Sequence, residues 1–490
     1  METVRYINFD GLLNTGVSDF LMKEDELTAC KNVWVYQIGK LEKVPGYELA
    51  DADSKVYTGK DVNYLHHYYR PSTKIDYLLG FSDTSTNYGV RQRTTGDWGA
   101  VTGGSWSGRA GAQVSVANFL DKAFIVGIDG TTFLAPTTIT GTVAEDDGLV
   151  DTDIADMPKG KYIVRFRNLL YVLHAYESAT LYPSRVYYCD EVTAGATGWT
   201  NVASAFIEFG HDDGDEITGG AEVIDRLIVF KRYSMWKYDE TEVKRVANVG
   251  CDSYRSIASI NEVVYWFNRK GFYRWGGKIP QLISAKIQKF IDGIAETNLG
   301  NVVASIYNEN EYRAFIGTVT VDGITYTNCW VCFNVLRERW YIRCTVDPGK
   351  SACQYIESGS GKRRMYWGNA NGDVHKFAQK VDNIYNDNGS EIDSFFITKA
   401  LDHGAPEQRK YANHMTFFTK YAQGMKVSVD TDRKNEFNVS QIQIINKNVD
   451  TKDFQAEGNR YTYKFHEKGN DKSWEFEGFV VEVELKGQDE

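Results

Sequence analysis

The sequence predicts an all-β protein whose main part is a β-propeller of about six to eight degenerate blades. Three observations indicate this fold: a high content of aromatic residues, many glycines with few prolines, and a hairpin-like unit that recurs along the chain. Tyr, Phe and Trp favour half-buried pleated surfaces, and Gly supplies the backbone conformations of tight turns. We expect an N-terminal arm and a C-terminal β-sandwich or platform module beside the propeller.

The composition supplies enough apolar surface for a chain of several structural units. Aromatic residues make up 14% of the 490 residues and hydrophobic residues 42%, with 44 Gly and only 8 Pro. A chain of this length is too long for one ordinary core, and its hydrophobic content is too high for global disorder. We therefore expect one large architecture or two to three domains.

The recurring unit is a short apolar strand, a polar or glycine-containing turn, and a second short aromatic strand. Asp129-Gly130 and Asn371-Gly372 are typical hairpin turns of these units. The units begin near positions 74, 119, 168, 225, 261, 329 and 362. Their mean spacing is close to the length of a four-stranded blade, and the pattern contains no long βαβ crossovers. Two stacked β-sandwiches are the alternative architecture.

Three regions follow from this pattern. We expect an extended arm and a hairpin over 1–48, the propeller over 49–390, and a C-terminal β-rich platform module over 391–490, because the blade pattern stops near position 391. One helix is predicted over 284–296 from apolar residues at helical spacing, which are Ile287, Phe290, Ile291 and Ile294.

Charge, cysteine content and hydropathy limit the classes of function. The net charge of −11 argues against sequence-blind attraction to nucleic acid, although an acidic channel wall would let DNA slide without adhering. Seven scattered cysteines predict a reducing cytosol rather than a disulfide scaffold. The apolar runs fall far short of the ~20 residues that span a bilayer, and METVRYINFDG does not have the pattern of a signal peptide.

Several motifs resemble catalytic or metal sites, but their residues do not have the spacing that such sites require. Gly349-Lys350-Ser351 lacks the glycine that a P-loop has five positions earlier, and we interpret it as a turn. Cys329 and Cys332 lie three residues apart in a strand-like run, so their side chains point to opposite faces and are interpreted as core thiols. The adjacent His66 and His67 diverge on any regular element. We assign no catalytic, cofactor-binding or metal residue, and we expect no enzyme and no cofactor.

Acidic and basic clusters are the remaining polar features. The acidic loops contain Glu145-Asp146-Asp147, Asp151, Asp153 and Asp156 in one case, and Asp212, Asp213, Asp215 and Glu216 in the other. Such loops can hold Ca²⁺, but neither matches an EF-hand or a nonapeptide repeat, so we interpret them as solvated. The basic stretches are Lys231-Arg232, Lys362-Arg363-Arg364 and Arg409-Lys410. We interpret these as solvated faces, with contact to phosphates on a DNA path as the alternative.

Several segments occur in a characteristic order along the chain. They are PSRVYYCD (183–190), GHDDGDEITGG (210–220), DRLIVFKRYSMWKYD (225–239), VGCDSYRSI (249–257) and NEVVYWFNRKGFYRWGGKIPQLISAKI (261–287). This run resembles tail proteins of tailed bacteriophages, of the kind that build the nozzle or the head–tail hub in short-tailed phages. The segments similar to the arm and the C-terminal module of that family are GLLNT (11–15), LEKVPGY (41–47), LDHGAPEQRK (401–410) and WEFEGFVVEVELKG (474–487).

The resemblance implies a structural virion component assembled in the host cytoplasm. It implies a homo-oligomeric ring, sixfold, of propeller-based subunits around the DNA exit channel. Such a ring would join head and tail, retain and release the genome, and dock an adaptor ring and tail fibres. Contact with the viral double-stranded DNA would be passive. The shared positions are turns and core strands, so no functional residue is carried over.

Two other functions stay open on the residues alone. The first is a carbohydrate-binding or carbohydrate-cleaving propeller that presents aromatics such as Trp199, Trp236 and Trp275 to surface glycans. Cleavage would need two carboxylates in an aromatic cleft, and the sequence singles out no such pair. The second is a bacterial scaffold propeller of unrelated origin.

Overall fold

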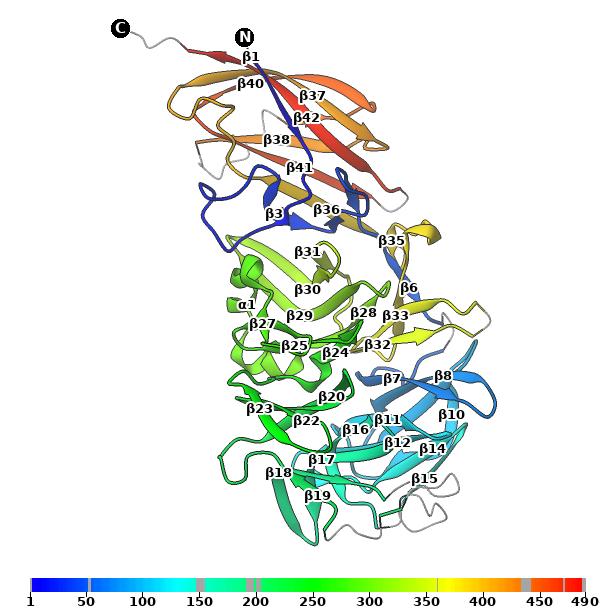
Figure 1. Ribbon diagram of the computed structural model, residues 1–490. Helices are drawn as coiled ribbons and strands as arrows, with labels where there is room; N and C mark the ends of the chain where they lie inside the picture. The colour runs from blue at the N-terminus through cyan, green and yellow to red at the C-terminus, as the bar shows by residue number, and fades with distance from the viewer. Residues whose placement is uncertain are drawn as a thin grey trace.

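A computed structural model describes residues 2–51, 54–146, 154, 156–190, 198–199, 204–358, 360–432, 442–469 and 472–486. Strands and turns make up almost all of these residues. These residues form two bodies, a propeller and a β-sandwich, that follow one another along the long dimension of the molecule (Figure 1). The predicted all-β class and the predicted propeller are confirmed.

The propeller in the described residues has seven blades of four antiparallel strands. Blade one consists of β7 (Val62–Arg70), β8 (Ile75–Asp83), β9 (Tyr88–Arg93) and β10 (Gly99–Trp106). Blade two consists of β11 (Gln113–Phe119), β12 (Lys122–Asp129), β14 (Thr137–Thr140) and β15 (Val143–Asp146), with β13 (Thr132–Phe133) beside β12. Blade three consists of β16 (Lys159–Phe166), β17 (Leu169–Glu177), β18 (Thr180–Tyr188) and β19 (Phe206–Glu208). A parallel bridge between Thr102 and Val143 joins the first two blades at their outer edges.

Blades four to seven continue the same pattern. Blade four consists of β20 (Ile217–Val223), β21 (Arg226–Lys231), β22 (Met235–Tyr238) and β23 (Val243–Ala247), and blade five of β24 (Ala258–Ile260), β25 (Val263–Asn268), β26 (Gly271–Trp275) and β27 (Gln281–Leu282). Blade six consists of β28 (Val303–Tyr307), β29 (Glu311–Val321), β30 (Ile324–Asn334) and β31 (Arg339–Cys344). Blade seven consists of β32 (Ser351–Ile356), β33 (Arg363–Gly368), β34 (Val374–Phe377) and β6 (Tyr47–Leu49). Each of the seven recurring hairpins predicted from the sequence lies in a different blade, which explains their ragged but regular spacing.

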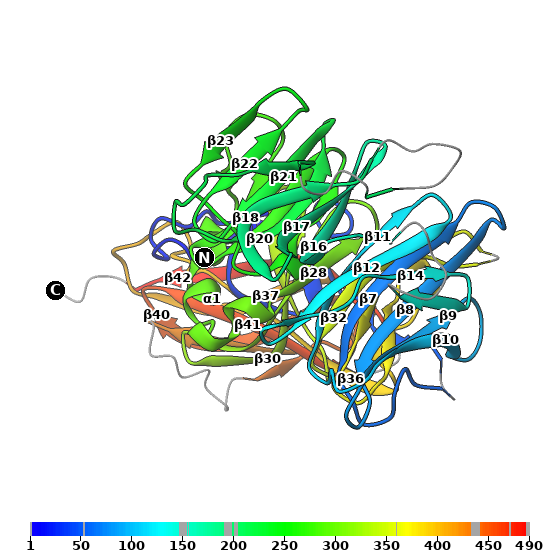
Figure 2. The ribbon, with the colours of Figure 1, turned by 90° about the horizontal axis from the view of Figure 1, so that it is seen from below.

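The innermost strands of the blades close into a ring. Strands β7, β11, β16, β20, β24, β28 and β32 contact one another in this order, and β32 returns to β7. Figure 2 looks onto this arrangement, with β9 and β10 at one side of the propeller and β22 and β23 at another. Apolar residues from adjacent blades fill the spaces between the sheets, as the strong apolar runs of the middle strands require.

The seventh blade takes its outer strand from the beginning of the chain. In β6, Tyr47 pairs with Phe377 and Leu49 with His375, antiparallel to β34. The backbone of Gly46, which precedes the strand, donates from its N–H to the Ile384 carbonyl at 2.8 Å. The ring is therefore closed by hydrogen bonds between residues far apart in the sequence, which removes the free edges that an open sheet would have there.

The β-sandwich packs two sheets face to face. One sheet contains β1 (Glu2–Ile7), β4 (Val33–Trp34), β5 (Leu41–Lys43), β37 (Lys410–Lys420), β40 (Val449–Gly458) and β42 (Glu475–Leu485). The other contains β2 (Leu12–Leu13), β3 (Glu26–Lys31), β36 (Ser390–Thr398), β38 (Lys426–Thr431), β39 (Gln443–Ile444) and β41 (Tyr461–Gly469). Aromatic rings fill the interior: Phe465 stacks on Phe396 at 4.6 Å between ring centres and tilts against Phe476 at 4.7 Å.

The first 48 residues, for which we expected an extended arm and a hairpin, contribute to both bodies. β1 pairs with β42, β3 pairs with β36, β4 and β5 form the hairpin, and β6 closes the propeller. A two-residue strand, β35 (Asn386–Asp387), pairs with β6 on one side and with β36 on the other. One continuous sheet therefore runs from blade seven into the sandwich.

The predicted helix is shorter than its apolar spacing suggested. It consists of a 3₁₀ turn (Ala285–Ile287) followed by α1 (Gln288–Asp292), and Gly293 ends it. Ile287, Phe290 and Ile291 are buried, so the predicted apolar face is correct. Among the residues that the structure describes, no helix is both long enough and apolar enough to cross a membrane.

The close approach of chain segments at Gly46 gives a test of propeller closure. A Cβ at position 46 would lie 1.7 Å from the Asn386 carbonyl oxygen, and no flexible side chain can move aside there. We expect Gly46→Ala to lower the free energy of unfolding by ~2–3 kcal/mol, measured by urea denaturation. Gly300→Ala is the control, because the nearest atom to its added Cβ lies 3.9 Å away. Equal stability of the two variants would contradict the closure.

Candidate functional site

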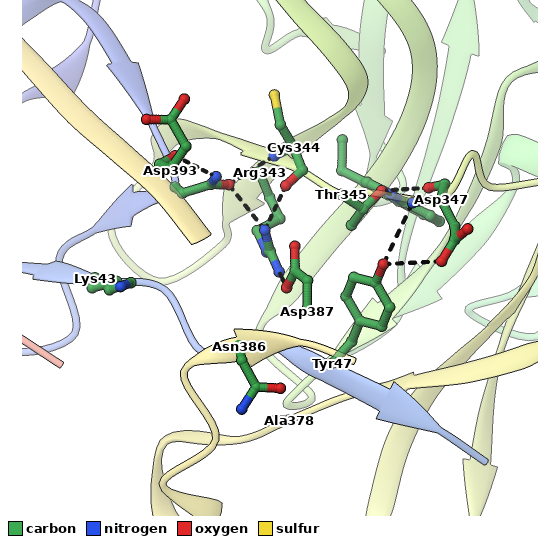
Figure 3. A network of polar contacts seen from close by, with 12 residues as sticks. Lys43, Tyr47, Arg343, Cys344, Thr345, Asp347, Ala378, Asn386, Asp387 and Asp393 are labelled. Atoms are coloured by element: carbon green, nitrogen blue, oxygen red, sulfur yellow. Dashed lines mark hydrogen bonds and ion pairs between the residues drawn. The ribbon is translucent and has the colours of Figure 1, made fainter. Parts of the chain in front are cut away.

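A buried ion pair lies where the propeller meets the sandwich (Figure 3). Arg343, in the outer strand of blade six, donates from its guanidinium to the carboxylate of Asp387 in β35. The same guanidinium donates to the Asn32 side-chain oxygen at 3.1 Å. All three residues are buried, with at most 3% of each side chain of the ion pair exposed. The pair thus joins the propeller to the strand that leads into the sandwich.

Asn32 extends this junction in a second direction. Its side-chain oxygen accepts a hydrogen bond from the Cys344 backbone N–H at 2.8 Å, and its side-chain N–H donates to the Asp393 carbonyl at 2.8 Å. Cys344 belongs to blade six and Asp393 to β36 of the sandwich. Asn32 has a positive φ of 58°, which Asn tolerates better than most residues. One buried amide therefore bonds to both bodies at once.

A second part of the junction surrounds the closing strand. The Tyr47 hydroxyl donates to the Asp347 carboxylate at 3.1 Å, and the Thr345 hydroxyl donates to the Asp347 carbonyl at 2.7 Å. His375 stacks on Trp367 with 4.3 Å between ring centres. Burial lowers the pKa of His375 to about 4 and raises the pKa of Tyr47 above its usual range, so both side chains are neutral at pH 7.

Further ion pairs attach the N-terminal segment to its surroundings. Lys43, whose side chain is fully buried, contacts the Glu467 carboxylate at 2.9 Å. Lys380 pairs with the buried Glu42, and Lys286 pairs with Glu26 at 2.6 Å. We call the first 48 residues, with these contacts, the N-terminal clasp. Breaking a buried pair leaves an uncompensated charge, so the clasp favours one arrangement of the two bodies.

Sequence patterns alone do not identify this junction. A signal was present, because Arg343 directly follows the apolar run WYI in the strand RWYIRC, and an arginine beside such a run needs a buried partner. Its partner Asp387 lies in a polar stretch that gives no sign of burial. The pairing depends on the fold, and neither residue alone predicts it.

The axis of the propeller is closed by a segment between blades four and five. Tyr254 begins a 3₁₀ turn there and donates from its hydroxyl to the Val114 carbonyl of blade two at 2.9 Å. The centre of its ring lies 5.0 Å from the centre of the Tyr162 ring. The Arg255 guanidinium donates to the Lys350 carbonyl, beside blade seven, at 3.2 Å. Side chains therefore cross the axis, and a cavity of about 470 Å³ remains on one side of them.

The described acidic loop lies beside a groove between blades three and four. Asp213 is bound to the buried Lys231 ammonium at 2.5 Å, and Asp215 accepts a hydrogen bond from the Ser234 hydroxyl at 2.8 Å. Asp212 is 88% exposed, and Glu216 lies 3.6 Å from Lys161. Two of the four carboxylates are thus occupied by internal partners rather than solvated. No group of three His, Cys, Asp or Glu side chains in the described parts of the chain is arranged to hold a metal ion.

Of the other acidic loop, Asp147, Asp151 and Asp153 lie outside the described residues. The structure describes the backbone of Glu145 and Asp146 at the end of β15, and Asp156 in a turn. The interpretation of this loop as solvated stays a prediction.

The basic stretches differ from the prediction of solvated faces. Lys231, Arg364 and Lys410 are buried, and each has specific partners. Arg364 pairs with Asp382 and lies 3.2 Å from Glu357, while Lys410 donates to the Gln408 carbonyl at 2.7 Å. Their long side chains carry charge into the interior to satisfy loop carbonyls and carboxylates, which strand patterns do not reveal. Their neighbours Arg232, Lys362, Arg363 and Arg409 are exposed, as predicted.

The remaining candidate motifs have structural surroundings. The Ser351 hydroxyl donates to the Val62 carbonyl at 2.7 Å, and the Lys350 ammonium lies 2.8 Å from Asp61, so this segment is the turn that leads into blade seven. His66 bonds to Asn118 at 2.8 Å, and His67 bonds to Asp76 at 2.7 Å. The two adjacent histidines diverge, as predicted.

The two cysteines of the CxxC segment lie in β30 and are buried. Cys329 pairs across the sheet with Cys344, whereas Cys332 pairs with Tyr341. Their interpretation as core thiols is confirmed.

The tryptophans proposed to face glycans do not all reach the surface. Trp199 is 2% exposed and Trp275 is 1% exposed, so both belong to the core. Trp236 is half-buried, and its indole N–H donates to the Ser234 hydroxyl at 2.9 Å. The prediction that these side chains face a glycan is therefore wrong for Trp199 and Trp275. Large aromatic rings contribute most to stability when they are buried in the spaces between blades.

Neither a protein-family model nor a curated protein matches this chain. Solved structures with some similarity include YCF48 from Cyanidioschyzon merolae, at 13% identity and a TM-score of 0.35, covering 68% of this chain and 98% of that one. A mutant of the Aleuria aurantia lectin in complex with α-methyl-L-fucoside has 13% identity and a TM-score of 0.30, covering 57% and 93%. A mutant of AofleA from Arthrobotrys oligospora has 12% identity and a TM-score of 0.31, covering 62% and 90%. Similarity at this level carries no argument about function.

The junction makes a direct prediction about stability. Asp387→Asn removes the charge that compensates the buried Arg343, and we expect it to lower the free energy of unfolding by ~3 kcal/mol or more. The control is Glu309→Gln, which breaks an exposed pair with Arg363 at 3.1 Å and should change stability by at most ~0.5 kcal/mol. Urea denaturation measures both. A change for Asp387→Asn no larger than that of the control would contradict the role of the pair.

Buried histidines predict how stability depends on pH. Burial lowers the pKa of His66, His174 and His375 to about 4 and that of His403 to about 3. In the unfolded chain a histidine titrates near pH ~6.5, so between about pH 6.5 and 4 the unfolded chain binds more protons than the folded one. The free energy of unfolding should therefore fall as the pH falls through this window.

Denaturation at pH 7, 6, 5 and 4 measures this dependence. His375→Gln should reduce its slope, whereas His211→Gln, at a side chain 69% exposed, should leave it unchanged. A free energy of unfolding that stays constant from pH 7 to 4 would show that these histidines do not carry the effect.

Proposed function

We propose that this chain is a structural subunit of the tail of a short-tailed bacteriophage, where copies of it form a ring that serves as nozzle or head–tail hub. Its role is mechanical: the ring surrounds the DNA exit channel, contributes to genome retention and release, and offers a surface for an adaptor ring and tail fibres. The proposal begins from the family resemblance of the segments quoted above, and one structural observation supports it.

That observation is the N-terminal clasp. The segment LEKVPGY contains Lys43, which is paired in the sandwich, and Tyr47, which closes the propeller. In the segment GLLNT, the Thr15 backbone N–H donates to the Lys286 carbonyl of the propeller at 2.7 Å. The residues that resemble the tail family therefore include some of those that fix the two bodies to one another. A subunit that carries force between head and host needs such a fixed connection.

The closed propeller axis supports a particular placement of DNA. Because Tyr254 and Arg255 cross the axis, a single propeller offers no channel for a duplex. In this proposal the channel is the space enclosed by several copies. The net charge of −11 favours weak, passive contact with the duplex over tight binding.

The sandwich offers edges through which copies can associate. Strands β1 and β40 each pair with a single neighbour among the described strands, and both lie at the end of the molecule away from the propeller (Figure 1). Ile442, Ile444 and Val449 are exposed apolar residues near the β40 edge. An unpaired edge beside apolar side chains is suited to addition of a strand from another chain.

Mass measurement and negative-stain imaging test this proposal, on the chain alone and with candidate portal or adaptor rings. We expect a closed ring, or docking onto such a ring. The double variant Ile444→Lys with Val449→Lys should weaken association at least about tenfold, because it places charge beside the β40 edge. Leu282→Lys, at a propeller side chain with 43% exposure, is the matched control. A chain that stays monomeric and ignores every ring would overturn the proposal.

A further inference from the structure

The groove between blades three and four has the features of a built ligand site. It has a volume of about 740 Å³ and is lined by Tyr182, Pro183, Arg185, Glu208, Asp212 and Tyr233, among others. These residues come from β18, from β19 and from the loops that flank β20 and β21. Concave surfaces with aromatic side chains and a few oriented polar groups are where small ligands bind.

One wall of the groove is held by a stacked arginine. The Arg185 guanidinium lies 3.9 Å from the centre of the Tyr182 ring and 3.8 Å from that of Phe206. It donates to the Glu208 carboxylate at 2.6 Å and to the Tyr187 hydroxyl at 3.1 Å. Contact with two aromatic rings fixes the position of a planar cation. Glu208 is therefore oriented before any ligand arrives, and its second oxygen, which lies 3.8 Å from His211 Nδ1, can still accept a hydrogen bond from a ligand.

The opposite wall is the acidic loop, and it is fixed from below. The Lys231 ammonium, which has no exposed surface, donates to the Ser184 hydroxyl at 3.0 Å and to the Phe209 carbonyl at 2.8 Å, and it binds Asp213. Asp215 accepts hydrogen bonds from the Tyr233 backbone N–H at 3.2 Å. A loop with this many internal bonds does not need to be ordered by its ligand, so binding costs less conformational entropy.

The groups left free at the rim decide the chemistry of the ligand. Tyr233 is 56% exposed, and Asp212 is 88% exposed, with the exposed His211 at 3.2 Å as its ion-pair partner among the described residues. The lining carries the carboxylates of Glu208, Asp212, Asp215 and Glu216 against the guanidinium groups of Arg185 and Arg232. Carboxylates are strong acceptors for hydroxyl and ammonium donors, and they repel other anions.

We propose that this groove binds a saccharide that is uncharged or carries an amino group. The exposed Tyr233 ring offers a flat apolar face to the C–H face of a sugar ring, while Glu208 and Asp212 accept hydrogen bonds from hydroxyl or amino groups. The carboxylates outnumber the guanidinium groups, so acidic sugars are disfavoured. The inference rests on the groove alone and holds whether or not the chain forms a ring.

Titration calorimetry and saturation-transfer NMR of the full chain test it, with glucose, galactose, glucosamine, N-acetylglucosamine and N-acetylneuraminic acid as probes. We expect binding of at least one neutral or amino sugar with a Kd of ~1 mM or lower, and at least about tenfold weaker binding of the acidic sugar. Tyr233→Ala and Glu208→Gln should each weaken binding at least about tenfold.

Two matched controls separate binding from stability. Tyr421→Ala removes a tyrosine of the sandwich that is 58% exposed, and Asp453→Asn removes a carboxylate that lies beside a histidine as Glu208 does. Both should bind sugar as the unaltered chain does, and thermal melts show whether any variant is destabilised. No detectable binding of any probe at 20 mM, preference for the acidic sugar, or unchanged binding by a folded Tyr233→Ala would overturn the proposal.

Discussion

The arrangement of the two bodies depends on one buried charge and its partner, Arg343 and Asp387. A guanidinium removed from water needs a carboxylate and further acceptors, and here Asp387 and Asn32 come from two distant parts of the chain, while the third acceptor is the carbonyl of the adjacent Cys344. Sandwich, propeller and clasp must therefore be in place together before the charge is satisfied. Continuous backbone pairing from blade seven through β35 into β36 acts in the same place. Apolar packing also continues across the junction, since one buried cluster contains Trp340 of blade six, Phe377 of blade seven and Phe396 of the sandwich, and the polar bonds add directional contacts between the bodies.

The surface features have different origins. At the axis, Tyr254 and Arg255 fill space and bond to main-chain carbonyls, which is what a closed core requires. Between blades three and four, the bond from Lys231 to Asp213 fixes the acidic loop, although the outward-facing Asp212 has few partners. Stability alone does not require a surface loop to be fixed in this way. This contrast separates a site of contact with other molecules from a site of internal packing. Function in a propeller lies in such loops, because the blades themselves are occupied with one another.

The sequence was informative where structure is local. Hairpins depend on turn residues and alternating apolar strands a few positions apart, so all seven central hairpins and the buried face of α1 could be predicted. Pairings such as Tyr47 with Phe377, or Glu2 with Val483, join residues from opposite ends of the chain, and no local pattern specifies them. Burial of Lys231 and Arg364 escaped prediction for the same reason, since their partners come from other turns. In the groove, the acidic loop could be identified, but its aromatic neighbours and its internal bonds could not.

The position of β6 has a consequence for how the protein is made. Its strand leaves the ribosome before any blade exists, and its partner β34 follows only after all other blades have been synthesised. The nascent propeller is therefore an open arc with two exposed edges for most of its synthesis, and β1 has no partner until β42 has been synthesised. Such long-range closure makes folding slow and exposes strand edges to other chains in the meantime. A cell that produces many copies at once would then gain from chaperones that shield these edges, so the yield of assembled protein would depend on folding conditions before it depended on final stability.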